Sequence, residues 1–471
     1  MADLPVPCCA CARKDREIAK LKSRILELES ENRELRQHLE EALRSKHRQT
    51  TRFPRNHLKK RRRRPGRKGG HEASHRPTPT PDQVSRVLDV PAPECCPDCR
   101  QALIDKKVVV QYQTDLPPVM PIITQFNVEI GFCPCCQKSH RGRHEEQTSE
   151  ALGAANHTLG PVVLTMAAEM KHHLGVPYRK ICDFYATYCH LEVAPATLVR
   201  AEQRLVKLAE PTYRLLLEAL RQCQVVHADE TGWRVGRVNA WLWVFSSKDT
   251  TIYVIRRGRG HQVPKEILGD FDGYLIVDGL KSYDVLEVAK GRCNSHLLRR
   301  CKAMETTLPT DQQPWATQLK HLLQDALALA QKRDTLRPET YAKRVDAIEE
   351  RLDGWLFDAT ESPDPDVWRL VKHVASHRAE WLVFLHDAEV PPTNNHAERM
   401  LRPAVITRKV GGCNKTLKGA AVHGVLASLI ATCRQQGGRF LDLCKKLWIG
   451  DGSQAIPMNA LPKTQAPPNL A

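Results

Sequence analysis

The chain has 471 residues, of which 41% are hydrophobic and 27% are charged, and its formal net charge is +17. This apolar content excludes a wholly disordered protein, and no run approaches the roughly 18 apolar residues of a membrane helix. The first eleven residues lack a charged stretch followed by an apolar one, so we expect no secretory signal. The 17 cysteines, an odd number, predict free thiols in a reducing compartment.

Residues 1–50 are predicted to form a coiled-coil dimerisation helix. Six of the eight core positions of four heptads are Ile or Leu, and the polar core residue Asn32 favours a parallel dimer. Flanking charges of opposite sign support this pairing. A single amphipathic helix packed on its own protein is the alternative. The core positions are Ile18, Leu21, Ile25, Leu28, Asn32, Leu35, Leu39 and Ala42.

Residues 51–82 read as a basic arm and linker. Within 51–70 there are ten Lys or Arg residues and no acid, so much of the net charge lies in one short segment. Such a run neutralises DNA phosphates and releases counterions without reading sequence. An RNA-binding segment or a localisation tag would have the same composition. The residues expected to contact DNA are Lys59, Lys60, Arg61, Arg62, Arg63, Arg64, Arg67 and Lys68.

Two cysteine pairs in residues 83–145 predict a zinc-ribbon-like domain. Each pair has the form Cys-Pro-x-Cys, and thiolates at that spacing on a tight turn can bind one Zn²⁺ ion. A closed site of four thiolates is structural. The alternation of Phe126, Val128, Ile130 and Phe132 predicts a strand before the second pair. The predicted ligands are Cys96, Cys99, Cys133 and Cys136, with Cys95 and Cys135 leaving the choice open and redox chemistry as the alternative.

Residues 155–212 are predicted to be helical. Helical patterns cover 162–173 and 178–188, and a third helix opens near Pro195, with tight turns between them. Two short helices joined by a tight turn are typical of a helix-turn-helix. On that interpretation Thr197 and Arg200 lie near the start of the helix that reads DNA. The alternative is a helical packing unit.

Residues 220–410 predict an α/β domain with acidic residues after its strands. Apolar strands are expected at 224–229, 241–245, 252–255 and 274–277, with a short helix at 264–268. Three strands, a helix and a strand is the order of the RNase H-like fold. Asp229 then ends the first strand and Asp278 follows the fourth. The predicted fold class is therefore multidomain α/β with an RNase H-like core.

A third acid is expected on a helix beyond a helical insertion at about 305–388. Thr393 is the predicted cap of this helix, which carries Glu398, and Asn395 and Arg402 share its face. Hard divalent cations prefer oxygen ligands, and two such ions can activate an attacking oxygen and stabilise a leaving one. We therefore expect Asp229, Asp278 and Glu398 to hold two Mg²⁺ ions, or Mn²⁺, with Asn395 orienting Glu398 and Arg402 binding a phosphate.

Four segments together resemble the DDE transposases of the insertion sequence 66 family. They are His227–Val235, Trp241–Val244, Val277–Gly279 with Tyr283, and Asn394–Arg399. The resemblance implies that Asp229, Asp278 and Glu398 are the catalytic triad of an enzyme that cuts the ends of an insertion sequence and joins the freed 3′ hydroxyl to target DNA.

The same resemblance covers a further basic segment and has visible departures. It implies that Cys293–Arg300, with His296, Arg299 and Arg300, matches the family's Cys-Trp-x-His-x-Arg-Arg segment. Asn294 replaces the usual Trp, and Gly232 stands where Pro is common. No acid is lost through these departures.

The expected partners are the terminal inverted repeats of the element, target DNA, and a second copy of the chain or a higher assembly, with accessory proteins as further candidates and no membrane. The expected location is cytoplasmic and nucleoid-associated in a prokaryote. Residues 411–450 are expected to be helical and 451–471 to be a disordered tail. Two alternative functions are a DNA-binding regulator or relic that has lost cleavage, and a structure-selective nuclease on the same fold.

Overall fold

The computed structural model describes residues 77–151, 157–450 and 452–463, together with four residues between 21 and 29. The chain divides into two units, Met1–Thr80 and Pro81–Ala471. In the first unit, Leu21, Ile25 and Leu28 are helical and exposed. The other predicted coiled-coil positions and the basic residues of the arm lie outside the described residues, so both remain predictions.

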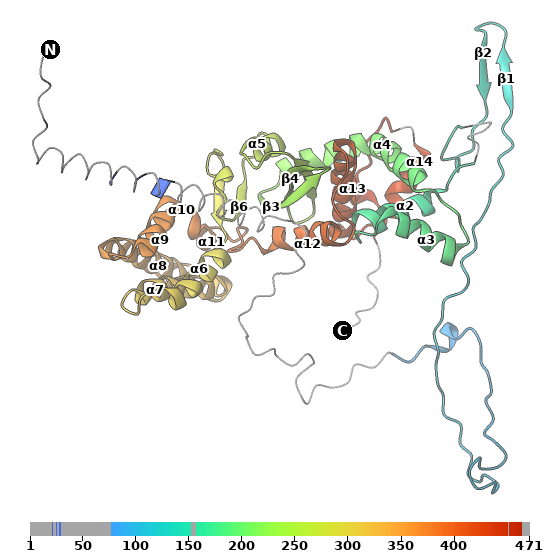
Figure 1. The fold of residues 1–471 in the computed structure, drawn as a ribbon, viewed down its shortest axis with the longest axis horizontal. Coiled ribbons are helices and arrows are strands. Elements are labelled where there is room, and N and C mark those ends of the chain that lie inside the picture. The colour runs from blue at the N-terminus through green and yellow to red at the C-terminus, as the bar shows by residue number, and fades with distance from the viewer. Residues whose placement is uncertain are drawn as a thin grey trace, which may run out of the picture. The chain divides into compact units, whose positions relative to one another are not determined.

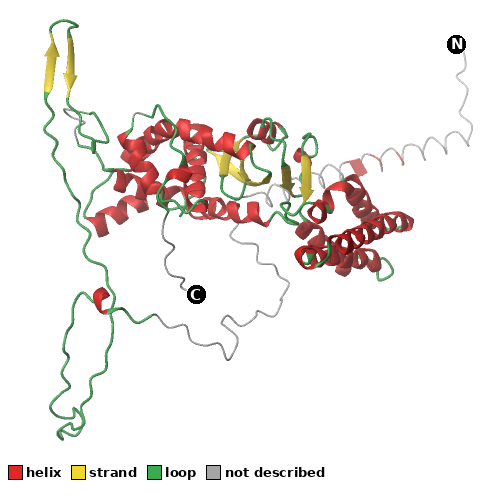
Figure 2. Ribbon diagram, turned by 180° about the vertical axis from the view of Figure 1, so that it is seen from behind, coloured by secondary structure: helices red, strands yellow, loops and turns green. Residues whose placement is uncertain are grey.

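Residues 81–150 contain few regular elements (Figures 1 and 2). A short helix, η1 (Pro81–Gln83), precedes one antiparallel hairpin of β1 (Ile130–Cys133) and β2 (Lys138–Arg141). The strand predicted from Phe126 to Phe132 is confirmed only in its second half, because β1 begins at Ile130. Large apolar side chains in this segment are exposed to solvent, among them Val108, which is 96% exposed, and Ile122, which is 95% exposed.

Three helices follow where the sequence pattern predicts them. They are α2 (Pro161–His172), α3 (Tyr178–Cys189) and α4 (Pro195–Arg221). Pro occupies the first turn of α2 and of α4, where its missing N–H costs no hydrogen bond. His190 ends α3 in the left-handed conformation with φ of 49°, which forms the tight turn before α4.

The central element is a five-stranded mixed sheet (Figure 2). Its order is β5-β4-β3-β6-β7, in which β3, β4 and β5 are antiparallel neighbours and β6 and β7 continue the sheet parallel to β3. Short turns join the antiparallel strands, whereas α5 (Gln262–Leu268) lies between β5 and β6. The strands are β3 (Val225–Val235), β4 (Val238–Ser246), β5 (Thr251–Arg256), β6 (Tyr274–Val277) and β7 (Ala289–Arg292).

A helical insertion follows the last strand and has a core of its own, which includes Leu319, Leu352 and Leu370. It begins earlier than the sequence pattern indicates, because its first helix starts at Asn294. Pro occupies the first turn of three of the helices and gives each a defined start. The helices are α6 (Asn294–Thr307), α7 (Gln313–Ala330), α8 (Pro338–Asp358), α9 (Pro365–Ser376), α10 (Arg378–Trp381) and α11 (Val383–His386).

Helices α12 (Asn395–Val410) and α13 (Leu417–Gln435) return to the sheet (Figure 1). Helix α13 lies along the edge strand β5, whose outer N–H groups would otherwise lack partners. Tyr253 N donates to Ser428 Oγ at 2.8 Å, and Thr251 N donates to Thr432 Oγ1 at 3.0 Å. Gly424 permits this approach, since a Cβ atom there would lie 2.8 Å from the Tyr253 carbonyl oxygen.

The C-terminal part is more ordered than the sequence pattern indicates. After α14 (Phe440–Ile449), the short helix η6 (Met458–Ala460) buries Met458, and Leu461 is buried with it. The prediction of disorder is therefore wrong for residues 452–463, and residues 464–471 lie outside the described part. Among the described residues, no helix is both long and apolar enough to cross a membrane.

Candidate active site

Two of the predicted acids lie side by side on neighbouring parallel strands. Residue His227 of β3 is level with Ile276 of β6, and continuing that register by two residues brings Asp229 level with Asp278. Asp278 directly follows β6, as predicted. Asp229 does not end its strand, because β3 continues to Val235 through its pairing with β4. The backbone of the acid is therefore paired with Val244 of β4, while the pairing of β3 with β6 ends two residues earlier, at His227.

Burial and neighbouring acids together raise the pKa of Asp229 to about 7. Burial is the largest cause, followed by the negative charge of Glu230, and Asp278 and Glu398 act in the same direction. A hydrogen bond from the Glu230 N–H to Asp229 Oδ1, at 2.8 Å, opposes the shift. The negative charges of both other predicted acids thus contribute to the raised pKa of Asp229.

Glu230 is a buried carboxylate whose charge is balanced within the protein. Arg259 Nη2 lies 2.6 Å from its Oε1, and the Tyr283 hydroxyl donates to its Oε2 at 3.2 Å. The Arg259 guanidinium also stacks 4.3 Å from the centre of the Trp241 ring. Arg259 could not be predicted from the sequence, because a single Arg in a loop carries no periodic signal.

Glu398 is directed towards cations on a neighbouring helix. Its Oε1 lies 3.0 Å from Arg299 Nη2 and 3.8 Å from His296 Nε2, both on α6. Asp278 Oδ1 instead accepts a hydrogen bond from Leu280 N at 2.9 Å. Within the described part of the chain, no three Asp, Glu, His or Cys side chains lie close enough to share one metal ion. The three acids are therefore electrostatic neighbours without forming a closed ligand set.

The start of α12 is attached to β3 by Asn394. The predicted cap Thr393 is wrong, because the cap position is Asn394 and its side chain serves another purpose. Its Nδ2 donates to the Ala228 carbonyl at 2.8 Å, and its Oδ1 lies 3.0 Å from His227 Nδ1. These bonds adjoin Asp229 and fix its distance from the helix that carries Glu398.

The other residues predicted on this helix, Asn395 and Arg402, are both exposed. The structure does not assign either of them a role, so the orienting function of Asn395 and the phosphate-binding function of Arg402 remain predictions.

Arg292 connects the second acid to the helical insertion. This side chain is fully buried at the end of β7, and its Nη1 donates to the Asp278 carbonyl oxygen at 3.0 Å. Its Nε donates to Glu380 Oε2 at 2.5 Å, and Nη2 pairs with Asp284. Arg292 could not be predicted from the sequence, because the Ala-Lys-Gly-Arg strand has no apolar pattern.

Asn294, which departs from the family pattern, joins the same region. It is fully buried, and its Nδ2 donates to the carbonyl oxygens of Trp381 and Pro392, each at 3.1 Å. An amide can donate both bonds at once. Asn294 thereby connects the start of α6 to the segment that leads into α12.

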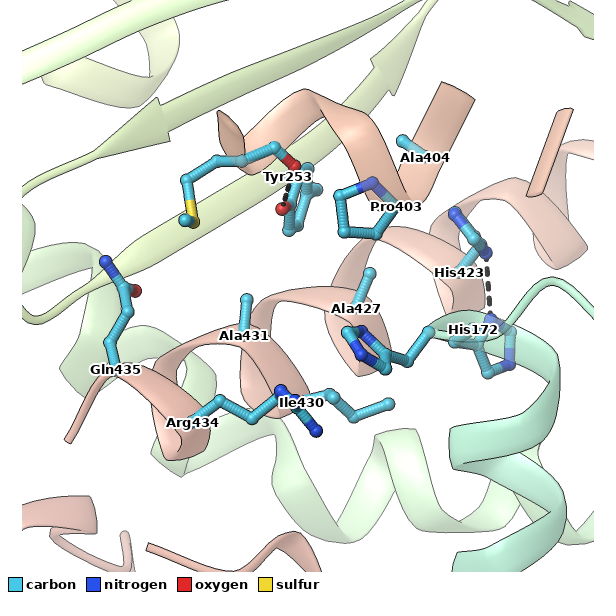
Figure 3. A pocket seen from close by; sticks show the side chains of 12 residues that line it. His172, Tyr253, Pro403, Ala404, His423, Ala427, Ile430, Ala431, Arg434 and Gln435 are labelled. Carbon is cyan, nitrogen blue, oxygen red and sulfur yellow. Dashed lines mark hydrogen bonds between the residues drawn. The ribbon is translucent and has the colours of Figure 1, made fainter. Parts of the chain in front are cut away.

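A cavity of about 250 Å³ is lined by residues of α2, β5, α12 and α13 (Figure 3). It contains none of the three acids. The Tyr253 hydroxyl donates to the Met400 carbonyl at 2.6 Å, and His172 Nδ1 lies 2.8 Å from His423 Nδ1. The first contact joins β5 to α12, and the second joins α2 to α13. The lining residues are His172, His173, Tyr253, Met400, Pro403, Ala404, His423, Ala427, Ile430, Ala431, Arg434 and Gln435.

The predicted zinc ligands form two separate turns. The pKa of the Cys96 thiol is lowered mainly by the backbone N–H of Cys99, and the pKa of the Cys133 thiol mainly by that of Cys136. Both turns thus favour the thiolate that binds metal. Among the residues described, the two turns do not come together as one ligand group.

The predicted DNA-reading residues Thr197 and Arg200 lie in the first turns of α4, and both are exposed. This position leaves their side chains accessible to a partner. A role in reading DNA remains a prediction.

The fold and these acids define a mixed α/β domain with an acidic centre between a sheet and a returning helix. The profile of the family described as "Transposase IS66 family" matches residues 157–422, which is more than half of the chain and includes all three acids. The chain therefore belongs to the IS66 family of transposases.

Two curated relatives come from Sinorhizobium fredii (strain NBRC 101917 / NGR234). "Uncharacterized protein y4qI" is 24% identical over 262 residues, which cover 48% of each chain. "Uncharacterized protein y4jD" is 24% identical over 281 residues, which cover 52% of this chain and 53% of the relative. The chain thus spans about half the length of the curated relatives it matches.

Proposed function

We propose that this protein is a DDE transposase that cuts DNA at the ends of an insertion sequence and transfers the freed 3′ hydroxyl into target DNA. Membership of the transposase family supports the biological role. The observation that carries the chemistry is the register of β3 with β6, which brings Asp229 level with Asp278. Burial is the largest cause of the raised pKa of Asp229, and the charges of Asp278 and Glu398 add to it. These are the three acids that the family resemblance implies.

The sheet order supports an RNase H-like core. Three antiparallel strands followed by two parallel ones place Asp229 on the first strand and Asp278 just after the fourth. The third acid then arrives on α12, after the insertion. The fold thereby brings Glu398 back to the side of the sheet that carries Asp229 and Asp278, although Glu398 follows Asp229 by 169 positions in the sequence.

The donor set fits a hard divalent cation. Asp229 and Asp278, with Glu398, would hold Mg²⁺ or Mn²⁺, since carboxylate oxygens are the preferred ligands of these ions. Burial, followed by the negative charge of neighbouring acids, raises the pKa of Asp229, and a bound cation would offset both effects. Two bound ions would activate the attacking oxygen and stabilise the leaving 3′ oxygen of a phosphodiester.

The chain's own groups position this centre. Asn394 fixes the start of α12 against β3, and Arg292 holds the backbone of Asp278. Arg259 balances the charge of Glu230, so that Glu230 adds less repulsion to the three acids. Positioning of this kind is needed because displaced catalytic groups lose much of their effect.

The remaining segments would bind DNA and pair the two element ends. The basic arm, Lys59–Lys68, supplies phosphate contacts, and Thr197 and Arg200 on α4 would reach base edges. The coiled coil over residues 1–50 would join two copies. A structural Zn²⁺ ion held by Cys96, Cys99, Cys133 and Cys136 would order residues 83–145.

The test is strand cleavage and joining on DNA that carries the element's own ends, with Mg²⁺, comparing wild type, Glu398→Gln and the exposed control Glu389→Gln. Joined products from wild type and the control, but none from Glu398→Gln, would support the proposal. Nicks without joining would indicate a nuclease. DNA binding without cleavage by wild type would indicate a regulator and overturn the enzymatic assignment.

A further inference from the structure

The carboxylate of Glu398, the third predicted acid, forms an ion pair with an arginine side chain of the protein. Glu398 Oε1 lies 3.0 Å from Arg299 Nη2, and Arg299 Nε donates to the Ser295 carbonyl at 3.2 Å, which fixes the direction of the guanidinium. His296 Nε2 lies 3.8 Å from the same carboxylate oxygen. The ion pair joins α6 of the insertion to α12, so both helices take part in setting the position of this acid.

This ion pair is accessible. The Arg299 side chain is 61% exposed and that of Glu398 is 36% exposed, so water and a ligand can reach both groups. Exposed ion pairs are weak, so this pair should weaken the binding of a competing cation to Glu398 by only about two- to fivefold. A divalent cation held by several carboxylates can therefore displace Arg299 from Glu398.

We propose that Arg299 exchanges Glu398 for a DNA phosphate. In the structure, Arg299 is paired with the Glu398 carboxylate. While this ion pair is present, Glu398 is not available to bind a metal ion together with Asp229 and Asp278. When Glu398 turns towards a cation beside Asp229 and Asp278, the guanidinium is released and binds a phosphate of the DNA strand. This inference rests on the proposed function, because it takes Glu398 as a metal ligand.

The chemistry of the guanidinium suits both partners. Its planar array of N–H groups matches carboxylate and phosphate oxygens alike. It lies within hydrogen-bonding reach of a predicted metal ligand, so a phosphate that it holds would lie next to the acidic centre. Metal binding and DNA binding should therefore reinforce each other through this residue.

The first test measures Mn²⁺ affinity of the full chain without DNA, by following free Mn²⁺ with electron paramagnetic resonance. Arg299→Ala should bind Mn²⁺ about two- to fivefold more tightly than wild type, since Glu398 is released. In the Glu398→Gln background the same change should have little further effect, which separates the ion pair from long-range charge. Lys302→Ala, which removes an exposed positive charge from the same helix, should change the affinity by less than Arg299→Ala.

The second test measures binding of a labelled duplex without element ends, at one salt concentration, in EDTA and in Ca²⁺. Arg299→Ala should weaken binding about two- to fivefold in Ca²⁺ and much less in EDTA, where Glu398 already occupies the guanidinium. An equal loss in both conditions, or an unchanged Mn²⁺ affinity, would overturn the exchange.

The two proposals fail in different ways. If wild type binds Mn²⁺ and Asp229→Asn weakens that binding, but Arg299→Ala changes nothing, the exchange is wrong and the metal-dependent function stands. If Asp229→Asn leaves Mn²⁺ binding unchanged, the carboxylate centre itself is wrong. Thermal melting of each variant verifies that it is folded, and the exposure of Arg299 makes a folding defect unexpected.

Discussion

The sheet domain and residues 81–150 differ in how far their side chains are buried. In the sheet domain, β3 and β4 bury most of their side chains, and even polar groups such as Arg292 and Asn394 are enclosed with partners. In residues 81–150 the apolar side chains of the long loop are exposed, and the two cysteine turns are the main local features. The first region has a large buried core, whereas the second buries little apolar surface, and we expect it to depend on a ligand or a partner for its stability.

The difference shows how each region depends on its surroundings. Burying apolar area stabilises a protein by roughly 25 cal/mol per Å², and a side chain such as Val108 or Ile122 gains none of it while exposed. A structural metal supplies folding free energy without a large core. The comparison therefore predicts that perturbing one region should leave the other intact.

Chelation gives the largest expected effect on the second region. Apparent binding free energies of structural zinc are about 10–16 kcal/mol, and they are folding free energies where no core exists. Removing Zn²⁺ should therefore unfold residues 90–140, measured as faster limited proteolysis within that segment, while the sheet domain stays resistant. Cys96→Ser should act like chelation, whereas Cys413→Ser, outside both turns, should not. Proteolysis that chelator does not change would contradict the zinc site.

Asp229→Asn should remove strand cleavage and keep DNA binding. The loss of one metal ligand costs several kcal/mol of transition-state stabilisation, which corresponds to about a hundredfold or more in rate. The variant should be at least as stable as wild type, because it removes a buried charge among other acids. The measurements are cleavage of end-bearing DNA and thermal melting. Cleavage at the wild-type rate would end the catalytic assignment of Asp229.

Arg292→Leu should destabilise the sheet domain by about 3–5 kcal/mol, because it leaves the carboxylates of Asp284 and Glu380 without their buried cation. The measurement is chemical unfolding followed by tryptophan fluorescence. The control is Arg351→Leu, which breaks an exposed pair with Asp325 and should cost less than about 1 kcal/mol. Equal effects of the two variants would show that burial of Arg292 is unimportant, and residues 81–150 should be unaffected by either.

Acid should destabilise the sheet domain through His423. Burial lowers the pKa of this histidine well below its usual value, and the neighbouring His172 and Lys171 act in the same direction. Below about pH 6.5 the unfolded chain binds a proton at His423, whereas the folded protein does not. The free energy of unfolding should therefore fall progressively as the pH drops from about 6.5 to about 5.

The variant His423→Gln tests this cause. It removes the titrating group and should flatten the dependence of unfolding free energy on pH over that interval. Since carboxylates titrate in both proteins, the difference between the two curves isolates His423. Parallel curves would refute this cause, and residues 81–150 should show no such component in either protein.

Much of the fold could be predicted because the relevant signal is local. The structure contains the apolar strands predicted before Asp229 and Asp278 and those at 241–245 and 252–255. It also contains the predicted helices that begin near residues 162 and 178 and at Pro195. Their pairing into a sheet follows from short turns and one intervening helix.

Other features have no local signal. Strand β7 forms from Ala289–Arg292 only because β6 offers a parallel partner and Gly291 accepts the close approach of Ile276. Asn394 replaces Thr393 at the helix start because its amide meets the backbone of β3. Met458 and Leu461 are buried because the helical domain presents a matching apolar surface.

The sequence by itself determined which residues could do chemistry: the three acids, the cysteine pairs and the basic run are written in residue type and spacing. The tertiary structure alone decided how the acids are held. Register between parallel strands sets Asp229 beside Asp278, and an ion pair between two helices directs Glu398 towards Arg299. Spacing along a chain specifies periodicity within one element, whereas contacts between distant elements depend on packing, which no single segment encodes.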